Sequence, residues 1–91
     1  RIKTFLQERM NKEEIISKIN SVLAEEFEKD ESEMVPEADL LETLELDSLD
    51  IVDMVVFIEQ TFGVVVKGAD FKGIKTFQDF YDFLDRRVNN L

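Results

Sequence analysis

Apolar residues recur at the spacing of an α-helix in three segments of the chain. The first stripe comprises Ile15, Ile16, Ile19, Val22, Leu23 and Phe27. Asn11 precedes this stripe, and Glu14 follows Asn11 by three residues, which is the pattern of a reciprocal N-terminal cap. The stripe and the cap together predict a helix over about residues 12–28.

A second helix is predicted over about residues 48–62. Asp47 can cap its start with Asp50 in the reciprocal position, and Gly63 suits the left-handed conformation that often follows a helix. At about 100° per residue, one face of this helix forms a core stripe, which comprises Ile51, Met54, Val55, Ile58 and Phe62.

The same helix has a second apolar patch, more than a quarter turn from the core stripe. It comprises Leu49, Val52 and Val56, and it is edged by Ser48, Asp53, Glu59 and Gln60. A helix in a small bundle needs only one buried stripe, so this second patch requires an explanation. Either the long segment before the helix covers it, or it is a protein-docking surface with an apolar centre and a charged rim.

The last helix follows Thr76, which with Asp79 resembles a further cap. Its stripe comprises Phe77, Phe80, Tyr81, Leu84, Val88 and Leu91. The segment 64–75 is predicted as a loop with one short helical turn near Ala69–Lys72, because its valine run has no evident partner strand. The predicted fold class is therefore all-α, a small four-helix bundle of three main helices and a short third helix, with a long first loop.

That first loop, residues 29–46, is polar and acidic and contains Pro36. A connection of this length in a compact domain is usually functional or carries a short turn of its own. We expect it to be anchored to the core by Leu40, Leu41, Leu44 and Leu46. Residues 1–10 precede the first cap and form an N-terminal extension, either frayed or docked as a helix, so the compact domain is assigned to residues 11–91.

The composition narrows the class of protein. Ninety-one residues suffice for one small domain, and the absence of cysteine excludes disulfides and fits a cytoplasmic protein. No run of apolar residues is long enough to span a bilayer, so no membrane insertion is expected. We expect the protein to be a monomer.

The charge is concentrated in one block. The chain has 21 acidic and 11 basic residues, a net charge of −10, and residues 30–66 contain no base at all. The acids of this block are Asp30, Glu31, Glu33, Glu37, Asp39, Glu42, Glu45, Asp47, Asp50, Asp53 and Glu59. Phosphate repulsion argues against nucleic acid, and basic proteins are the natural partners. The alternative is a merely solubilising acidic surface.

Ser48 lies inside this acidic block. A serine hydroxyl needs a neighbouring base to act as a nucleophile, and the chain has no histidine and residues 30–66 have no lysine. We therefore expect no enzymatic activity. Two roles remain open: an ordinary first-turn residue, or a serine that another enzyme modifies, since a helix N-terminus favours a phosphate ester.

The stretch LELDSLDIVDMVVFIEQTFGVVV resembles the signature of the acyl carrier proteins, an Asp-Ser-Leu motif followed by an acidic and apolar helix. The resemblance extends over about residues 11–90. It implies that Ser48, flanked by the motif residues Asp47 and Leu49, carries 4′-phosphopantetheine through a phosphodiester. The thiol of that group would hold acyl chains for the enzymes of fatty-acid or related biosynthesis.

The resemblance also implies partners for the second helix. Val52, Asp53, Val56 and Glu59 match positions through which the family docks basic enzymes, and Asp50 lies beside them. These partners would be a phosphopantetheinyl transferase and acyl-processing enzymes with basic docking patches. An acyl chain could fold back between the helices, in a cleft lined by Met54, Val55, Ile58 and Phe62.

The chain departs from the family pattern at three places. Glu45 stands where the family usually has glycine, and Gln60 stands where a further acid is frequent. The segment before the last helix, acidic in many members, carries Lys67, Lys72 and Lys75. These departures bear on which partner enzymes the protein serves.

Other readings of the acidic helix are possible. Asp47, Asp50 and Asp53 are spaced by three on a predicted helix and lack the glycine of a calcium-binding EF-hand loop, so no metal site is expected. A non-catalytic interaction domain would use Ser48 only as a first-turn residue. A carrier of aminoacyl, D-alanyl or polyketide groups would share the arm, but the strongly acidic helix favours a fatty-acyl carrier.

Overall fold

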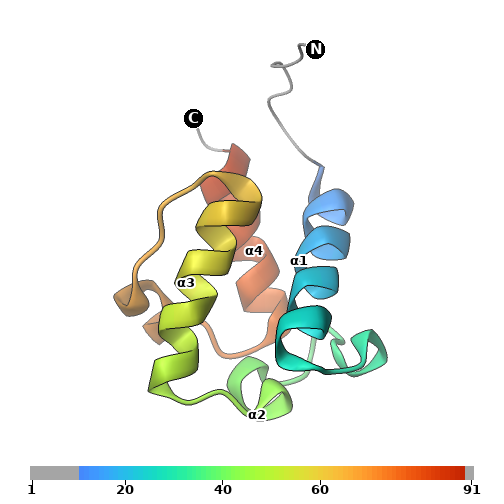
Figure 1. Ribbon diagram of the computed structural model, residues 1–91. Coiled ribbons are helices and arrows are strands. Elements are labelled where there is room, and N and C mark those ends of the chain that lie inside the picture. The colour runs from blue at the N-terminus through green and yellow to red at the C-terminus, as the bar shows by residue number, and fades with distance from the viewer. Residues whose placement is uncertain (1–10, 90–91) are drawn as a thin grey trace.

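The computed structural model describes residues 11–89, which form four α-helices and two short 3₁₀ helices (Figure 1). Their order is α1 (Lys12–Phe27), η2 (Glu31–Glu33), α2 (Leu40–Leu44), α3 (Ser48–Phe62), η3 (Gly68–Gly73) and α4 (Phe77–Asn89). The all-α class is confirmed, and η3 lies where the short third helix was predicted. The N-terminal extension and Leu91 of the last stripe lie outside the described residues.

The three long helices share one core, with α4 lying between α1 and α3 (Figure 1). The predicted cap of α1 is confirmed, because the backbone N–H of Glu14 donates to Asn11 Oδ1 at 2.8 Å and the N–H of Asn11 donates to Glu14 Oε1 at 3.1 Å. The inner face of α1 buries Ile15, Ile19 and Leu23 completely. Removing such apolar surface from water is the main stabilising contribution to a domain of this size.

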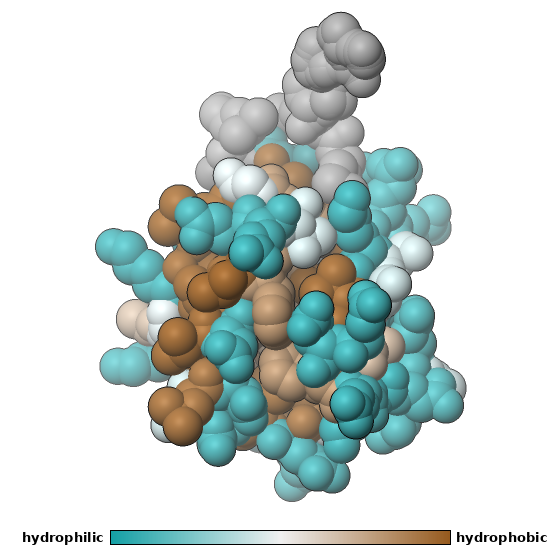
Figure 2. All heavy atoms as spheres, viewed as in Figure 1, coloured by the Kyte–Doolittle hydropathy of each residue, from teal (hydrophilic) through white to brown (hydrophobic). Residues whose placement is uncertain are grey.

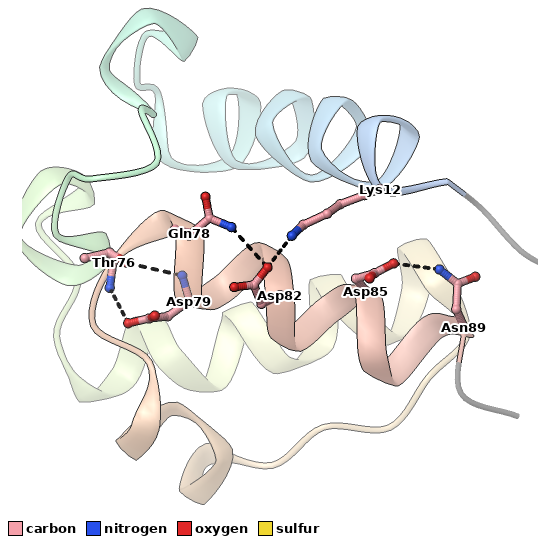
Figure 3. A network of polar contacts seen from close by, with 7 residues as sticks. All are labelled: Lys12, Thr76, Gln78, Asp79, Asp82, Asp85 and Asn89. Atoms are coloured by element: carbon pink, nitrogen blue, oxygen red, sulfur yellow. Dashed lines mark hydrogen bonds and ion pairs between the residues drawn. The ribbon is translucent and has the colours of Figure 1, made fainter.

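Helix α4 supplies the aromatic part of the core. Its predicted cap is confirmed by reciprocal bonds between Thr76 and Asp79, of 3.1 and 3.2 Å. The side chains that it buries are Phe77, Phe80, Tyr81, Phe83, Leu84 and Val88. On its outer side, Asp82 accepts hydrogen bonds from Gln78 and from the Lys12 ammonium, which ties α4 to the start of α1 (Figure 3). The Lys12 hydrogen bond lowers the pKa of Asp82.

The first connection is more ordered than a loop. It contains η2 and the five-residue helix α2, which Asp39 caps by accepting from the N–H of Glu42 at 2.8 Å. That N–H is the main cause that lowers the pKa of Asp39. The Tyr81 hydroxyl lies 2.8 Å from Asn20 Oδ1 and 3.3 Å from the carbonyl oxygen of Met34, so one buried side chain of α4 contacts both α1 and the connection.

Backbone hydrogen bonds join the same connection to the segment that precedes and begins α4. The N–H of Leu40 donates to the Lys75 carbonyl at 2.8 Å, and the N–H of Phe77 donates to the Ala38 carbonyl at 3.0 Å. Asp39 and Thr76 form an isolated antiparallel bridge between these bonds. The polar backbone of a long irregular segment is satisfied in this way without a sheet.

Helix α3 ends as predicted, with Gly63 in the left-handed conformation at φ 72° and its N–H bonded to the Glu59 carbonyl at 2.8 Å. Phe57, which belongs neither to the core stripe nor to the second apolar patch, makes an edge-to-face contact with Phe27 of α1, with ring centroids 5.9 Å apart. The valine run after α3 is irregular; Val66 is buried and Val65 is exposed.

Glu45 adopts a left-handed conformation, with φ 57° and ψ 47°, at the end of α2. This conformation explains why glycine suits the position, since glycine reaches it without a steric cost. Glu45 here forms an ion pair with Lys29 at 3.4 Å, but its side chain is 77% exposed, so the pair contributes little. The turn that leads into α3 is therefore made with a strained residue.

We predict that Glu45→Gly stabilises the protein. Left-handed backbone costs a non-glycine residue about 1–2 kcal/mol, which exceeds the roughly 0.5–1 kcal/mol of extra chain entropy that glycine loses on folding. The net gain should be about 0.5–1 kcal/mol, which raises the Tm of a domain of this size by several degrees. Thermal unfolding followed by circular dichroism measures the shift.

Glu45→Gln is the matched control, because it removes the ion pair and keeps the strained backbone. We expect its Tm to equal or fall slightly below that of the parent. A Glu45→Gly protein no more stable than Glu45→Gln would show that the left-handed residue carries no strain.

Candidate functional site

The start of α3 is defined by a reciprocal cap. Asp47 Oδ1 accepts from the N–H groups of Leu49 and Asp50, at 3.0 and 3.1 Å. Asp50 Oδ2 in turn accepts from the N–H of Asp47 at 3.1 Å. Both carboxylates are thus held against the backbone at the positive end of the helix dipole, where negative charge is favourable. This cap places Ser48 as the first residue of the helix.

The Ser48 side chain is exposed and unpartnered. No side chain or backbone group among residues 11–89 forms a hydrogen bond with its hydroxyl. The two carboxylates next to it are occupied by the capping bonds, and the chain has no histidine. The hydroxyl is therefore accessible to another molecule, and no base within residues 11–89 is hydrogen-bonded to it.

The second apolar patch of α3 is open to solvent. Leu49 is 75% exposed, Val52 60% and Val56 42%. Asp53, Glu59 and Gln60 are exposed around them, and Asp50 is half-buried. In Figure 2 apolar side chains gather along α3 and are interspersed with polar ones. The interpretation that the first connection covers this patch is wrong.

The opposite face of α3 belongs to the core. Met54 and Ile58 are completely buried, and Val55, Phe62 and Ile51 are partly buried and packed against the same core. The four residues predicted to line an acyl cleft therefore face the interior together. In the structure they form closed packing, so an acyl chain could enter only if neighbouring side chains moved.

The described residues can also be compared with the requirements of a metal site and of a membrane-spanning helix. Within residues 11–89, no group of three or more His, Cys, Asp and Glu side chains is arranged to hold a metal ion. The helices of this described part are also too short or too polar to cross a membrane.

The sequence identified the lysines of the segment after α3 as a departure from the family pattern, but not which of them are exposed and unpaired. Val65 is 63% exposed, and Lys67 and Lys72 on either side of Asp70 are exposed as well. The sequence shows the change of charge at Lys67. It does not show which lysines form ion pairs, because ion pairs can join residues far apart in the chain.

Comparison with known proteins agrees with this geometry. A family model described as "Phosphopantetheine attachment site" matches residues 17–84. The acyl carrier protein of Thermotoga maritima is 40% identical over 78 residues, which cover 86% of this chain and 96% of that protein. The acyl carrier protein of Thermosynechococcus vestitus is 37% identical over 79 residues, which cover 87% of this chain and 98% of that protein.

The acyl carrier protein of Rubrobacter xylanophilus is 37% identical over 75 residues, 82% of this chain and 93% of its own. The matches extend over nearly all of the described bundle, including the helix that begins at Ser48 and both of its faces. The chain belongs to the acyl carrier proteins, the family that carries acyl groups on phosphopantetheine.

Proposed function

We propose that Ser48 is the attachment site of 4′-phosphopantetheine and that the protein presents fatty-acyl thioesters to biosynthetic enzymes in the cytoplasm. The observation that carries this proposal is the exposed, unpartnered Ser48 hydroxyl at the first turn of α3, within the Asp-Ser-Leu motif. The chain acts as a carrier and not as a catalyst in this proposal, because the neighbouring carboxylates of Asp47 and Asp50 are engaged by backbone N–H groups and are not hydrogen-bonded to Ser48. The transferase must supply the base that removes the hydroxyl proton as the Ser48 oxygen attacks the phosphorus next to pantetheine in coenzyme A, the pyrophosphate bond breaks and the nucleotide portion leaves as a bisphosphate.

The surroundings of Ser48 fit a phosphodiester. A phosphate at a helix N-terminus is favoured by the dipole, and the opposing term is repulsion from Asp47 and Asp50. Both carboxylates accept hydrogen bonds from backbone N–H groups, and the Ser48 side chain between them in the sequence is exposed. The thiol at the end of the bound group is the reactive atom that holds the acyl chain.

Ser48→Ala should abolish the mass gain that follows incubation of the unmodified protein with a phosphopantetheinyl transferase and coenzyme A. The hydroxyl makes no hydrogen bond in the described part of the chain, so the fold and Tm should be unchanged. Intact-protein mass spectrometry measures the gain.

Ser17→Ala, Ser21→Ala and Ser32→Ala are the controls, and each should be modified like the parent. These serines are also exposed, but they lie in α1 and η2, away from the start of α3. A mass gain in the Ser48→Ala protein would show that another residue carries the group.

We also propose that the exposed face of α3 is the docking surface for basic enzymes. The apolar centre of an interface usually carries most of its binding energy, whereas charges on its rim mainly steer association. Val52 and Val56 form such a centre here, with Asp53 and Glu59 on its rim. Asp50 lies next to Ser48 and adds to the field that a basic partner meets first.

Rate measurements with a transferase separate these two roles. Asp53→Asn and Glu59→Gln should lower the association rate by a few-fold at low salt and flatten its salt dependence. Val56→Asn should instead raise the dissociation rate by about tenfold or more, because it removes apolar contact area. If all three variants remain folded and bind like the parent, the docking surface lies elsewhere.

The buried face of α3 is proposed to shelter the acyl chain. Burying about five methylene groups would contribute on the order of 4 kcal/mol, less the cost of opening the packed core around Met54 and Ile58. The long-chain acylated form should therefore have a higher Tm than the form with a free thiol, as measured by calorimetry. Equal Tm values would indicate that the chain stays outside the bundle.

A further inference from the structure

The sign of the surface charge reverses immediately after the docking helix. Residues 30–66 contain no base, whereas residues 67–75 contain Lys67, Lys72 and Lys75 and one acid, Asp70. The reversal coincides with η3 and its flanks. In a chain of net charge −10, a cluster of lysines beside an acidic surface is a local feature that the overall charge conceals.

The single acid of this segment does not neutralise the lysine ammonium groups. Asp70 Oδ2 accepts from the backbone N–H of Lys67 at 2.9 Å and lies 3.6 Å from the Arg87 guanidinium. Among residues 11–89, no carboxylate lies within 4.0 Å of the Lys67 or Lys72 ammonium. Both side chains are exposed, so their charge is directed to the solvent.

Arg87 of α4 holds this segment in place. Its guanidinium donates to the Val65 carbonyl at 2.7 Å and lies 4.9 Å from the centre of the Phe83 ring. Together with the ion pair to Asp70, these contacts fix the loop after α3 and the start of η3 against α4. Phe71 and Ile74 are buried beneath it. The lysines therefore project from a fixed support and not from a loose loop.

The segment that carries Lys67 and Lys72 lies against α3, the helix that begins at Ser48. Helix η3 packs against α3, and it lies beside the N-terminal half of that helix in both Figure 1 and Figure 3. The N-terminal half of α3 thus has acids along the helix itself and beside it the segment of η3, which Lys67 precedes and which contains Lys72. Val65, 63% exposed, adds an apolar residue next to Lys67.

We infer that η3 forms a second, basic half of the docking surface, and that the cell's own phosphopantetheinyl transferase faces it with carboxylates. This inference rests on the proposed attachment at Ser48. An enzyme that transfers a group to the Ser48 hydroxyl must approach the start of α3 directly, so its surface also covers η3. Enzymes that act on the distant thiol are under no such constraint.

A second copy of this chain is a less suitable occupant. Two copies repel each other because each carries a net charge of −10, and bringing two blocks of eleven acids together would oppose contact at η3. A transferase with a basic patch for α3 and an acidic patch for η3 matches both signs. Such a pairing would also discriminate against enzymes that carry only basic docking patches.

Charge reversal on η3 tests this inference by the sign of its effect. Lys67→Glu and Lys72→Glu are compared with Lys18→Glu, an exposed lysine on α1 that has no ion pair within the described residues. All three variants change the net charge equally. The readout is kcat/KM for transfer from coenzyme A by the transferase of the same organism, measured by mass gain at low and high salt.

We expect Lys67→Glu and Lys72→Glu to lower kcat/KM by roughly three- to tenfold relative to Lys18→Glu, with the difference shrinking at high salt. A transferase with only a basic patch would give the opposite sign, because an added acid would speed its association. Equal or faster modification of the η3 variants than of Lys18→Glu would therefore overturn the inference.

Two further measurements identify the cause of any change. Circular dichroism must show that the variants are folded, which is expected because both lysines are exposed and unpaired. Sedimentation velocity should show a monomer; a dimer that Lys72→Glu dissociates would assign the lysines to a second copy and overturn the inference. If the parent protein itself gains no mass, the attachment at Ser48 fails instead, and the inference fails with it.

Discussion

The reciprocal hydrogen bonds between Asp47 and Asp50 determine where α3 begins, and the arrangement of the site depends on that start. Successive residues of a helix are rotated by about 100°, so burial of one apolar stripe leaves the side chains on the opposite face exposed. With the observed start, Met54 and Ile58 face inward and Val52 and Val56 face outward. Two short side chains therefore fix the end of the helix, and with it the first-turn position of Ser48.

The same acids serve two electrostatic purposes at different ranges. At contact distance their oxygens satisfy N–H groups that the first turn of a helix leaves unpaired. At longer range their charge adds to the acidic field of residues 30–66, which capping does not remove. Ser48 is surrounded by acids that cap α3 and that, in the proposed docking, would also attract basic partners.

Much of the fold could be predicted because separate signals agreed. Helices α1, α3 and α4 each combine a capping pair with a continuous apolar stripe, and all three begin within a residue of the predicted start. Helix α2 was not predicted as a helix because five residues are too few to show a period, although Asp39 and Glu42 have the spacing of a cap. The left-handed Glu45 could not be predicted, since that conformation favours glycine.

Some features of the candidate site could likewise be predicted from the sequence, and others could not. The first-turn position of Ser48 and the two faces of α3 follow from local patterns. Whether the outer face was covered depended on the path of the first connection, which no local pattern specifies. The contact of Phe57 with Phe27 and the pairing of Asp70 with Arg87 join residues far apart in the chain. These contacts determine which side chains remain free to bind another molecule. They form only when the helices pack together, so no local sequence pattern predicts them.

The backbone bonds between the first connection and the start of α4 have a consequence for the order of folding. Leu40 and Phe77 reach partners at Lys75 and Ala38, so each bond closes a loop of more than thirty residues. The entropy of closing that loop must be overcome before the bonds can contribute, whereas the turns of α1 and α3 form from neighbouring residues. These bonds between the first connection and the start of α4 can therefore form only when α4 docks. On the ribosome this happens last, because α4 is the final helix of the described chain to be synthesised.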